Sequence, residues 1–157
     1  MSGVIPIDLG VVRLSRDAEV ELVAYSLGSC VAVCVWDPAG PLGGMAHVVL
    51  PTGRDGGAAS GRYADQAVPL LAGLLERAGG CPRRAVWKIA GGANVLRAAT
   101  LPPIGERNIA AVRAALRAQG LDIAAEDTGG STGRTVRLRV RDGRVRIRLT
   151  TGEERDL

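Results

Sequence analysis

Short apolar runs separated by glycine- and proline-rich turns dominate the first half of the chain. Runs at 19–25, 30–36 and 45–50 are rich in valine, alanine and leucine, which is typical of β-strands. Residues 52–61 then contain four glycines and no apolar periodicity. The pattern therefore predicts three strands followed by a loop.

Two segments place apolar residues three or four positions apart, which is the spacing of an amphipathic helix. The first covers 63–78 and ends before a pair of glycines, and Pro69 inside it predicts a kink or a helix that starts close to the proline. The second covers 106–119 and stops at Gly120. We expect both helices to pack on a sheet.

Strands outnumber helices along the whole chain. Further strands are expected at 85–90 and 121–126, and 134–149 alternates apolar residues with arginines around Asp142-Gly143, a strong hairpin signal. Because strands and helices follow one another in mixed order, the sequence predicts a mixed α/β (α+β) fold with a layered β-sheet core and flanking helices.

The hairpin presents its arginines on one face. A two-residue turn would place like charges opposite each other in three pairs: Arg137–Arg148, Arg139–Arg146 and Arg141–Arg144. Like charges in such positions destabilise a sheet, so anionic groups should lie nearby. They could come from a neighbouring strand or from the acidic tail, Glu153, Glu154 and Asp156. The face is either solvated or a docking surface for an acidic partner.

Composition narrows the class of protein. A length of 157 residues suits one domain over 1–157, and the 46% of hydrophobic residues, almost without aromatics, predicts an aliphatic core. The net charge of +4 is too small to demand a nucleic acid. Three cysteines argue against a disulfide framework, and no leader or spanning segment is recognised. We expect a cytoplasmic protein without membrane insertion.

The candidate chemistry centres on Cys30 in LGSCVAV and on His47, the one histidine, in GGMAHVVLP. Each lies near the expected start of a strand, and a connection of hairpin length joins the two strands. An imidazolium stabilises a thiolate and can protonate a leaving group, which suits acyl transfer from an amide or ester. Gly28, Ser29 and Gly44 are the candidate substrate- or oxyanion-binding residues.

The residues alone leave other interpretations open. A cysteine at a strand start is often a small core residue, and a lone histidine is often structural. A zinc site would need Cys30, Cys34, His47 and Cys81. Cys30 and Cys34 are four residues apart on one expected strand, which separates them by about 13 Å. A single zinc ion needs both sulfurs at about 2.3 Å from it. The spacing therefore argues against a metal.

A series of motifs resembles the chemoreceptor glutamine deamidases, the CheD family. Beyond the segments around Cys30 and His47 they are RYAD at 62–65, KIAGGAN at 88–94, IGERN at 104–108 and DTGGSTGR at 127–134. The resemblance covers nearly the whole chain and implies layered sheets with flanking helices and no cofactor. It implies hydrolysis of glutamine side chains on methyl-accepting chemotaxis receptors and, in some systems, binding of a CheC-type phosphatase. Asn108 is expected to hydrogen-bond locally.

The resemblance assigns Cys30 as the nucleophile and His47 as the acid and base of a protein-glutamine glutaminase. The thiolate would attack the carboxamide carbon, and the resulting thioester would be hydrolysed by a water that His47 activates. The family commonly places a third catalytic residue, a threonine, six positions before the cysteine, where this chain has Ala24. Ser26 would lie on the same face if the strand persists that far, and it is the candidate replacement.

Two other functions remain open. The chain could be a chemotaxis adaptor that binds a CheC-type phosphatase or receptors with weak or no deamidase activity. The same thioester chemistry would also serve a methylesterase acting on receptor glutamyl esters.

Overall fold

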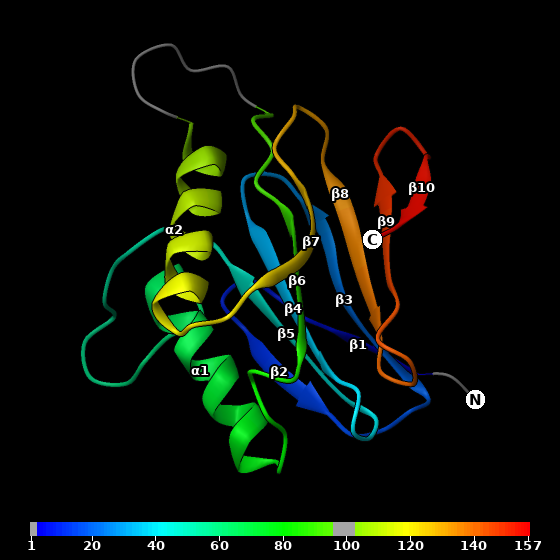
Figure 1. Cartoon of the computed structure of the whole chain (residues 1–157). Coiled ribbons are helices and arrows are strands. Elements are labelled where there is room, and N and C mark those ends of the chain that lie inside the picture. Colours follow the sequence, from blue (N-terminus) through cyan, green and yellow to red (C-terminus); the bar gives the residue numbers. More distant parts are fainter. Residues whose placement is uncertain (1–2, 96–102) are drawn as a thin grey trace.

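The computed structural model describes residues 3–95 and 103–157, which contain two helices and ten strands (Figure 1). The strands form two five-stranded sheets. In spatial order, the first sheet contains β1 (Gly3–Pro6), β3 (Val20–Leu27), β8 (Arg134–Arg139), β9 (Val145–Leu149) and β10 (Glu154–Asp156). The second contains β2 (Val12–Ser15), β5 (Leu42–Val48), β4 (Val31–Asp37), β6 (Val86–Gly91) and β7 (Ile123–Thr128).

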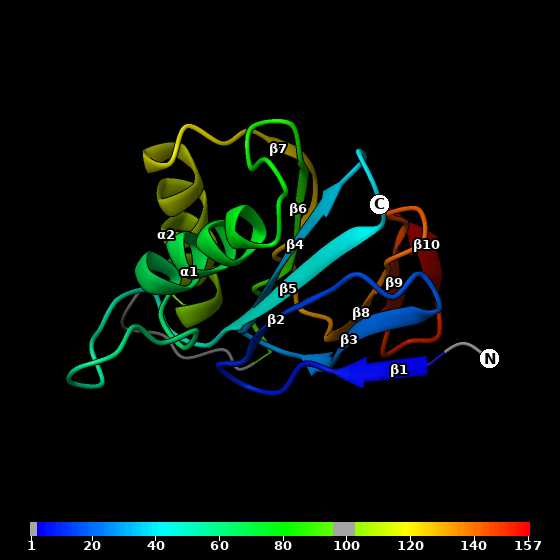
Figure 2. The same cartoon turned by 90° about the horizontal axis from the view of Figure 1, so that it is seen from below.

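The molecule has three layers, which Figure 2 shows edge-on. Helices α1 (Ala64–Arg77) and α2 (Ile104–Ala118) cover one face of the second sheet, and the first sheet covers its other face. The predicted mixed α/β fold with layered sheets and flanking helices is confirmed.

Strand β4 contributes to two hydrophobic cores. Val31, Val33 and Val35 face the helices, whereas Ala32 and Cys34 face the first sheet. A strand that is buried on both faces reads as a continuous apolar run rather than an alternating one, which explains the sequence VAVCV. Burial raises the pKa of the Cys34 thiol to about 12, as befits a core residue.

One element boundary differs from the predictions. Strand β5 runs from Leu42 to Val48, so His47 lies near the end of its strand and not near the start. Helix α1 agrees with the predicted range of 63–78, and it continues through Pro69 instead of starting close to it. Strands β1, β2 and β10 were not predicted, because runs of three or four residues are too short to show a periodicity.

The β8–β9 hairpin has a longer turn than predicted. Arg137 lies opposite Arg146, and the Arg139 N–H donates to the Arg144 carbonyl, so the three predicted arginine pairs are wrong. The turn covers 140–143, where the Gly143 N–H donates to the Arg139 carbonyl at 2.8 Å and the Val140 N–H donates to the Val20 carbonyl at 3.2 Å. The predicted burial of the apolar face is confirmed for Val136, Leu138, Val140, Val145 and Ile147.

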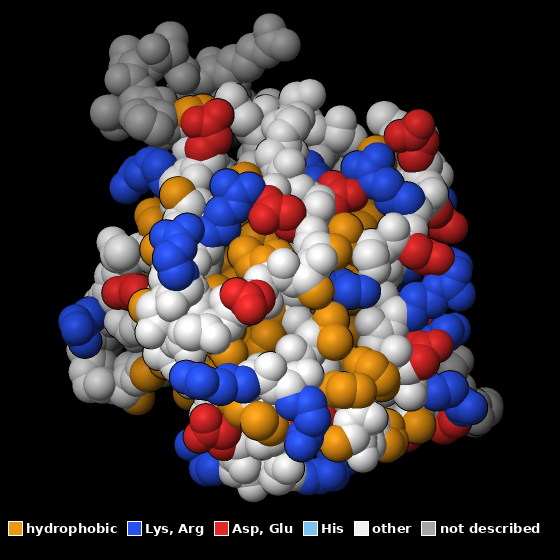
Figure 3. Space-filling model, viewed as in Figure 1, with side chains coloured by type: hydrophobic (Ala, Val, Ile, Leu, Met, Phe, Trp, Pro, Cys, Tyr) orange, Lys and Arg blue, Asp and Glu red, His pale blue; other side chains and the backbone are white. Residues whose placement is uncertain are grey.

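The arginine face carries its own counter-ions. Carboxylates come from strand β3, from the turns and from β10, and the ion pairs are Arg137–Glu21, Arg139–Asp142, Arg141–Glu19, Arg144–Asp156, Arg146–Asp156 and Arg148–Glu154. Figure 3 shows blue and red side chains interleaved along the edge formed by β9 and β10. The prediction of nearby anionic groups is confirmed. These exposed pairs neutralise the arginines within the chain itself, which favours a solvated face over a face that needs an acidic partner.

Three further findings concern membrane-spanning helices, disulfide bonds and metal sites. No helix in the described residues is long and apolar enough to cross a membrane. The three cysteines are free thiols. Within 3–95 and 103–157, no group of three or more His, Cys, Asp or Glu side chains is arranged to hold a metal ion.

Candidate active site

Cys30 lies in the connection that carries the chain from the first sheet to the second, between the last residue of β3 and the first of β4. Every carbonyl in this connection accepts a hydrogen bond: Gly28 from the Ala93 N–H at 2.8 Å, Ser29 from the Asn108 amide at 2.9 Å, and Cys30 from the Gly92 N–H at 2.8 Å. The connection is irregular in conformation, but hydrogen bonds hold it along its whole length.

The N–H groups of the same connection have no such partners. Those of Gly28, Ser29 and Cys30 donate to no protein acceptor within the described part of the chain. N–H groups next to a nucleophile are the usual donors to a developing oxyanion. The connection can therefore supply polar donors beside the Cys30 thiol.

Antiparallel pairing brings His47 to the same end of the sheet as Cys30. His47 lies opposite Ala32, and Cys30 precedes Ala32 by two residues, so both side chains are on the same face. Diagonal neighbours of this kind are about 7–8 Å apart between Cα atoms, within reach of their side chains. The sequence predicts both residues near strand starts, which would lie at opposite ends of a hairpin. His47 approaches Cys30 because it lies at the end of β5.

The His47 ring is held in one tautomer. Its Nδ1 lies 2.7 Å from the Ile7 carbonyl oxygen, which can only accept, so Nδ1 carries the proton and Nε2 is free to accept one. Burial lowers the pKa of His47, and the Ile7 carbonyl and the Asp8 charge oppose this effect only partly. The neutral ring with an unprotonated Nε2 is a base at neutral pH.

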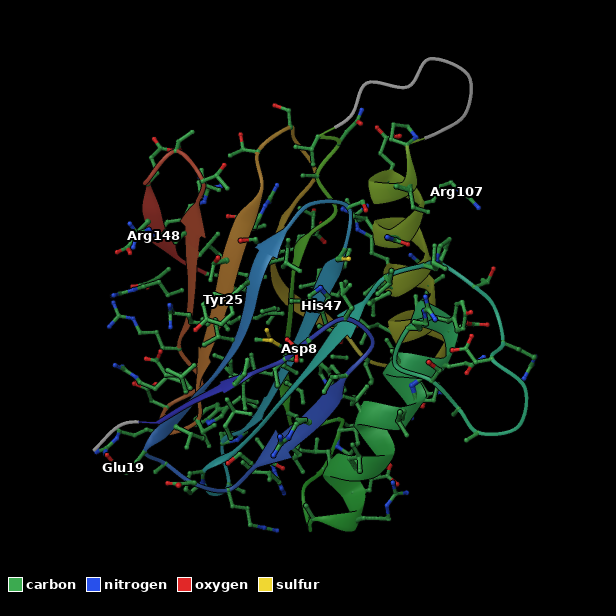
Figure 4. All side chains as sticks on the ribbon, turned by 180° about the vertical axis from the view of Figure 1, so that it is seen from behind. Asp8, Glu19, Tyr25, His47, Arg107 and Arg148 are labelled. Carbon is green, nitrogen blue, oxygen red and sulfur yellow. The ribbon has the colours of Figure 1, made fainter. Side chains whose placement is uncertain are left out.

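A cavity of about 470 Å³ opens over Cys30 and His47. It is lined by Ile7, Asp8, Leu9, Tyr25, Ser26, Leu27, Cys30 and His47. Figure 4 shows His47 on β5, Asp8 in the segment after β1 and Tyr25 on β3 close to one another. The cavity lies where the two sheets meet. Its walls come from residues after β1 and at the end of β3, in the first sheet, and from His47 on β5, in the second sheet.

Burial also raises the pKa of the Cys30 thiol. Together with the lowered pKa of His47, this favours a neutral thiol beside a neutral imidazole in the resting protein. The arrangement can transfer a proton from sulfur to Nε2 during an attack, and does not require a preformed thiolate.

Ser26 lines the cavity, but not for the reason expected from the sequence. Strand β3 continues through Ser26 to Leu27, but its pairing with β8 shifts between Ala24 and Leu27, so the regular alternation of faces from Ala24 to Ser26 is interrupted. Ser26 has φ +51°, which is uncommon for a residue with a side chain, and its N–H donates to the Thr135 hydroxyl at 3.1 Å. Ala24 is fully buried in the core between the sheets.

The other candidate residues divide into two groups. Gly28 and Ser29 directly precede Cys30, and they contribute main-chain groups to the site. Gly44 lies on the face of β5 that packs under α1, where an added Cβ would come 2.8 Å from both Leu14 and Leu71. The structure does not bring Gly44 to the cavity.

Three groups of the site have roles that the sequence does not predict. The Ile7 carbonyl orients His47, and no side-chain pattern could reveal a main-chain acceptor. Asp8 lies near His47 from a segment that was not predicted as structured. Asn108 does not bond locally as expected, because its amide reaches the carbonyls of Ser29 and Val49. Its place in the IGERN motif was the one available signal.

Known proteins resemble the chain over nearly its whole length. Residues 49–149 match a family described as CheD chemotactic sensory transduction. A probable chemoreceptor glutamine deamidase CheD of Archaeoglobus fulgidus is 39% identical over 156 residues, or 98% of each chain. One of Symbiobacterium thermophilum is 41% identical over 96% of this chain and 95% of its own. The chemoreceptor glutamine deamidase CheD of Thermotoga maritima is 41% identical over 85% of this chain and 84% of its own.

Proposed function

The chain belongs to the CheD family of chemoreceptor glutamine deamidases, and from this membership we propose that it hydrolyses glutamine side chains of chemotaxis receptors to glutamate and ammonia. The observation that carries the proposal is that Cys30 and His47 line the same cavity. A cysteine and a base that share a cavity can perform acyl transfer on an amide. We propose the cytoplasm as the place of this reaction, in agreement with a role in chemotaxis signalling.

The reaction begins with proton transfer. His47 Nε2 takes the proton of the Cys30 thiol while the sulfur attacks the carboxamide carbon of the substrate. The imidazolium that forms keeps its Nδ1–H on the Ile7 carbonyl, and the charge of Asp8 stabilises it. The negative charge that develops on the substrate oxygen is stabilised by N–H groups of Ser29 and Cys30.

Breakdown of the tetrahedral intermediate gives a thioester. His47 returns the proton to the amide nitrogen, the C–N bond breaks, and ammonia leaves. Nε2 then removes a proton from a water molecule, whose oxygen attacks the thioester carbon. The C–S bond breaks, glutamate is released, and the proton on His47 returns to the Cys30 sulfur.

Two groups take over the role of the family threonine in this chain, the Ile7 carbonyl and Ser26. The Ile7 carbonyl orients the ring of His47, so a hydroxyl at position 24 is not needed for that purpose. Ser26, whose side chain lines the cavity, is proposed to bind the substrate amide or the attacking water. A Ser26→Ala variant that deamidates at the wild-type rate would remove Ser26 from the mechanism.

The rim of the cavity fits a protein substrate. Leu9 and Tyr25 line the cavity with 66% and 49% of their surfaces exposed. The Arg137 guanidinium lies 5.6 Å from the centre of the Tyr25 ring and helps to hold it, as in a cation–π pair. Exposed apolar side chains around a polar site are typical of a surface that receives another protein. We assign this rim to the receptor segment that flanks the glutamine.

An adaptor function is the second candidate. It is favoured by Ala24, which is fully buried and offers no hydroxyl where the family has a catalytic one. In that case the chain would bind receptors or a CheC-type phosphatase, and Cys30 would not turn over.

Ammonia release from a purified receptor separates the two functions. We expect release with the wild type and with Cys81→Ala, a control at another partly buried free thiol, and none with Cys30→Ala. Equal release from Cys30→Ala would show that the Cys30 mechanism is wrong. Binding of the receptor without release from any of the proteins would favour the adaptor.

A further inference from the structure

Asn108 lies behind the candidate nucleophile, on the first turns of α2, and its side chain is fully buried with 0% exposure. The helix can approach this closely because glycines meet at the contact. A Cβ on Gly105 would come 2.5 Å from the Gly92 carbonyl oxygen and 2.6 Å from that of Ala93. With no side chain between the backbones, a residue as short as asparagine can reach the ends of β4 and β5.

The Asn108 amide bridges two strand ends. Its Nδ2 donates to the carbonyl of Ser29 and to that of Val49, each at 2.9 Å. The β4–β5 ladder ends at the pair Val31–Val48, so neither carbonyl belongs to the ladder. One of them immediately precedes Cys30 in the chain, and the other follows His47 by two residues.

Asn108 acts from the side opposite the cavity. Val31 and Val48 face the helices, and the adjacent residues Cys30 and His47 therefore face the first sheet, where the cavity lies. The side chain of Asn108 touches main-chain atoms and does not line the cavity. It can influence the reaction only through the positions of Cys30 and His47.

The chemistry of the contact selects an amide. Two carbonyls need two donors from one short side chain, which an NH₂ group supplies. The Oδ1 of Asn108 is buried without a partner in the described residues, and turning the amide over would place this oxygen against both carbonyls. An unsatisfied buried oxygen is a cost that a purely structural position would avoid with an apolar residue.

We propose that Asn108 is a positioning residue, which clamps the start of β4 to the end of β5 and so sets the separation of the Cys30 sulfur from His47 Nε2. The inference rests on the proposed function, because it concerns the same pair of residues. Errors of about 1 Å in such a separation can lower rates about a hundredfold.

Two measurements test the clamp in the full chain. The first is the rate of Cys30 alkylation by iodoacetamide across pH, which needs no receptor. The second is kcat and KM for receptor deamidation. The variant is Asn108→Leu, which keeps the approximate size but removes both donors, and His47→Gln defines alkylation without the base. Val112→Ala, one turn further along α2 and fully buried, is the matched control for loss of stability.

We expect Asn108→Leu to lower kcat at least about tenfold with KM nearly unchanged, and to shift the alkylation profile toward that of His47→Gln. Val112→Ala should lower the melting temperature and leave the profile as in the wild type. Should Asn108→Leu not fold, Asn108→Ser retains one donor, and an intermediate shift of the profile is expected. A wild-type profile in the folded Asn108 variant would overturn the proposal.

The alkylation arm separates this proposal from the proposed reaction. If Asn108→Leu shifts the alkylation profile but the wild type does not deamidate receptors, the clamp is supported and the proposed reaction is rejected. If the wild type deamidates receptors but Asn108→Leu keeps the wild-type alkylation profile, the proposed reaction is supported and the clamp is rejected.

Discussion

His47 has 5% of its surface exposed, and its Nδ1 is bound to the Ile7 carbonyl at 2.7 Å. This environment determines which form of the ring is present. Burial penalises the imidazolium and lowers its pKa below the ordinary value of 6.5, and the Ile7 carbonyl fixes Nε2 as the accepting nitrogen. At the scale of the residue, the site is built to keep a neutral base beside a neutral thiol.

The pH dependence of the deamidation rate follows from that form. Because the proposed mechanism uses the neutral ring of His47 as the base, kcat/KM should be constant with respect to His47 near pH 7 and fall as the pH drops through the lowered pKa, below 6.5. The measurement is kcat/KM on a receptor fragment from pH 5 to 8. A rate that increases on acidification would mean that the imidazolium is the active form.

The residue types of the site could be predicted from the sequence, but their supports could not. Cys30 and His47 stand out because a thiol and a single imidazole are chemically distinctive. The orienting group of His47 is a main-chain carbonyl, Ile7, and a carbonyl has no signature in a sequence. The partners of Asn108 are separated from it by more than fifty residues along the chain, so only the fold could reveal them.

The contact of α2 with the end of β6 links two elements to the site. Gly92 has φ +69°, and an added Cβ would lie 2.4 Å from the Ile109 side chain. The Gly92 N–H also holds the Cys30 carbonyl. At the scale of the element, the packing of α2 and the position of Cys30, the proposed nucleophile, depend on one glycine.

Replacing Gly92 by alanine should therefore affect both stability and rate. We expect Gly92→Ala to lower the free energy of unfolding by about 1–3 kcal/mol through overpacking and backbone strain, and to lower kcat. Gly57→Ala is the control, since Gly57 has φ +70° with nothing within 4 Å of an added Cβ. Urea titration measures the free energy of unfolding of both variants, and the deamidation assay measures their kcat. A loss no larger than that of Gly57→Ala would show that the contact with Ile109 yields without cost.

The order of elements was predictable to the extent that each one forms its own pattern. The central strands and both helices have long apolar patterns, and these predictions hold in the structure. Strand β5 was placed too late because Gly43 and Gly44 read as a turn, whereas close packing under α1 requires a glycine inside the strand at position 44. The hairpin register was wrong because the Asp142-Gly143 pattern does not reveal that Arg139 pairs with Arg144, which leaves the turn over 140–143.

At the scale of the whole molecule, the end of the second sheet opposite the candidate site binds the connection between α1 and β6. Asp37, at the opposite end of β4 from Cys30, is buried to 1% exposure. Its carboxylate accepts from the N–H groups of Ala39 and Cys81 and from the Arg84 guanidinium. The Arg84 guanidinium holds the pKa of Asp37 well below its usual range.

Removal of this carboxylate charge should lower stability without changing catalysis. We expect Asp37→Asn to lower the free energy of unfolding by about 1–2 kcal/mol at pH 7, since the half-exposed Arg84 limits the effect. Because folding lowers the Asp37 pKa, the stabilisation is present above the unfolded pKa near 3.9 and disappears as the pH falls. Denaturation of both proteins from pH 7 to 3 measures this. A wild-type stability at pH 7, or a changed kcat, would contradict the assignment.

Hydroxylamine trapping during receptor deamidation tests the central claim, a covalent thioester on Cys30, most directly. Hydroxylamine competes with water for a thioester, so the wild type should convert receptor glutamine to the glutamyl hydroxamate at the expense of glutamate, and Cys30→Ala should form neither product. Mass spectrometry of the receptor peptides distinguishes the hydroxamate from the acid. Continued formation of glutamate by the wild type with no hydroxamate at any hydroxylamine concentration would mean that water attacks the amide directly, which would contradict the mechanism.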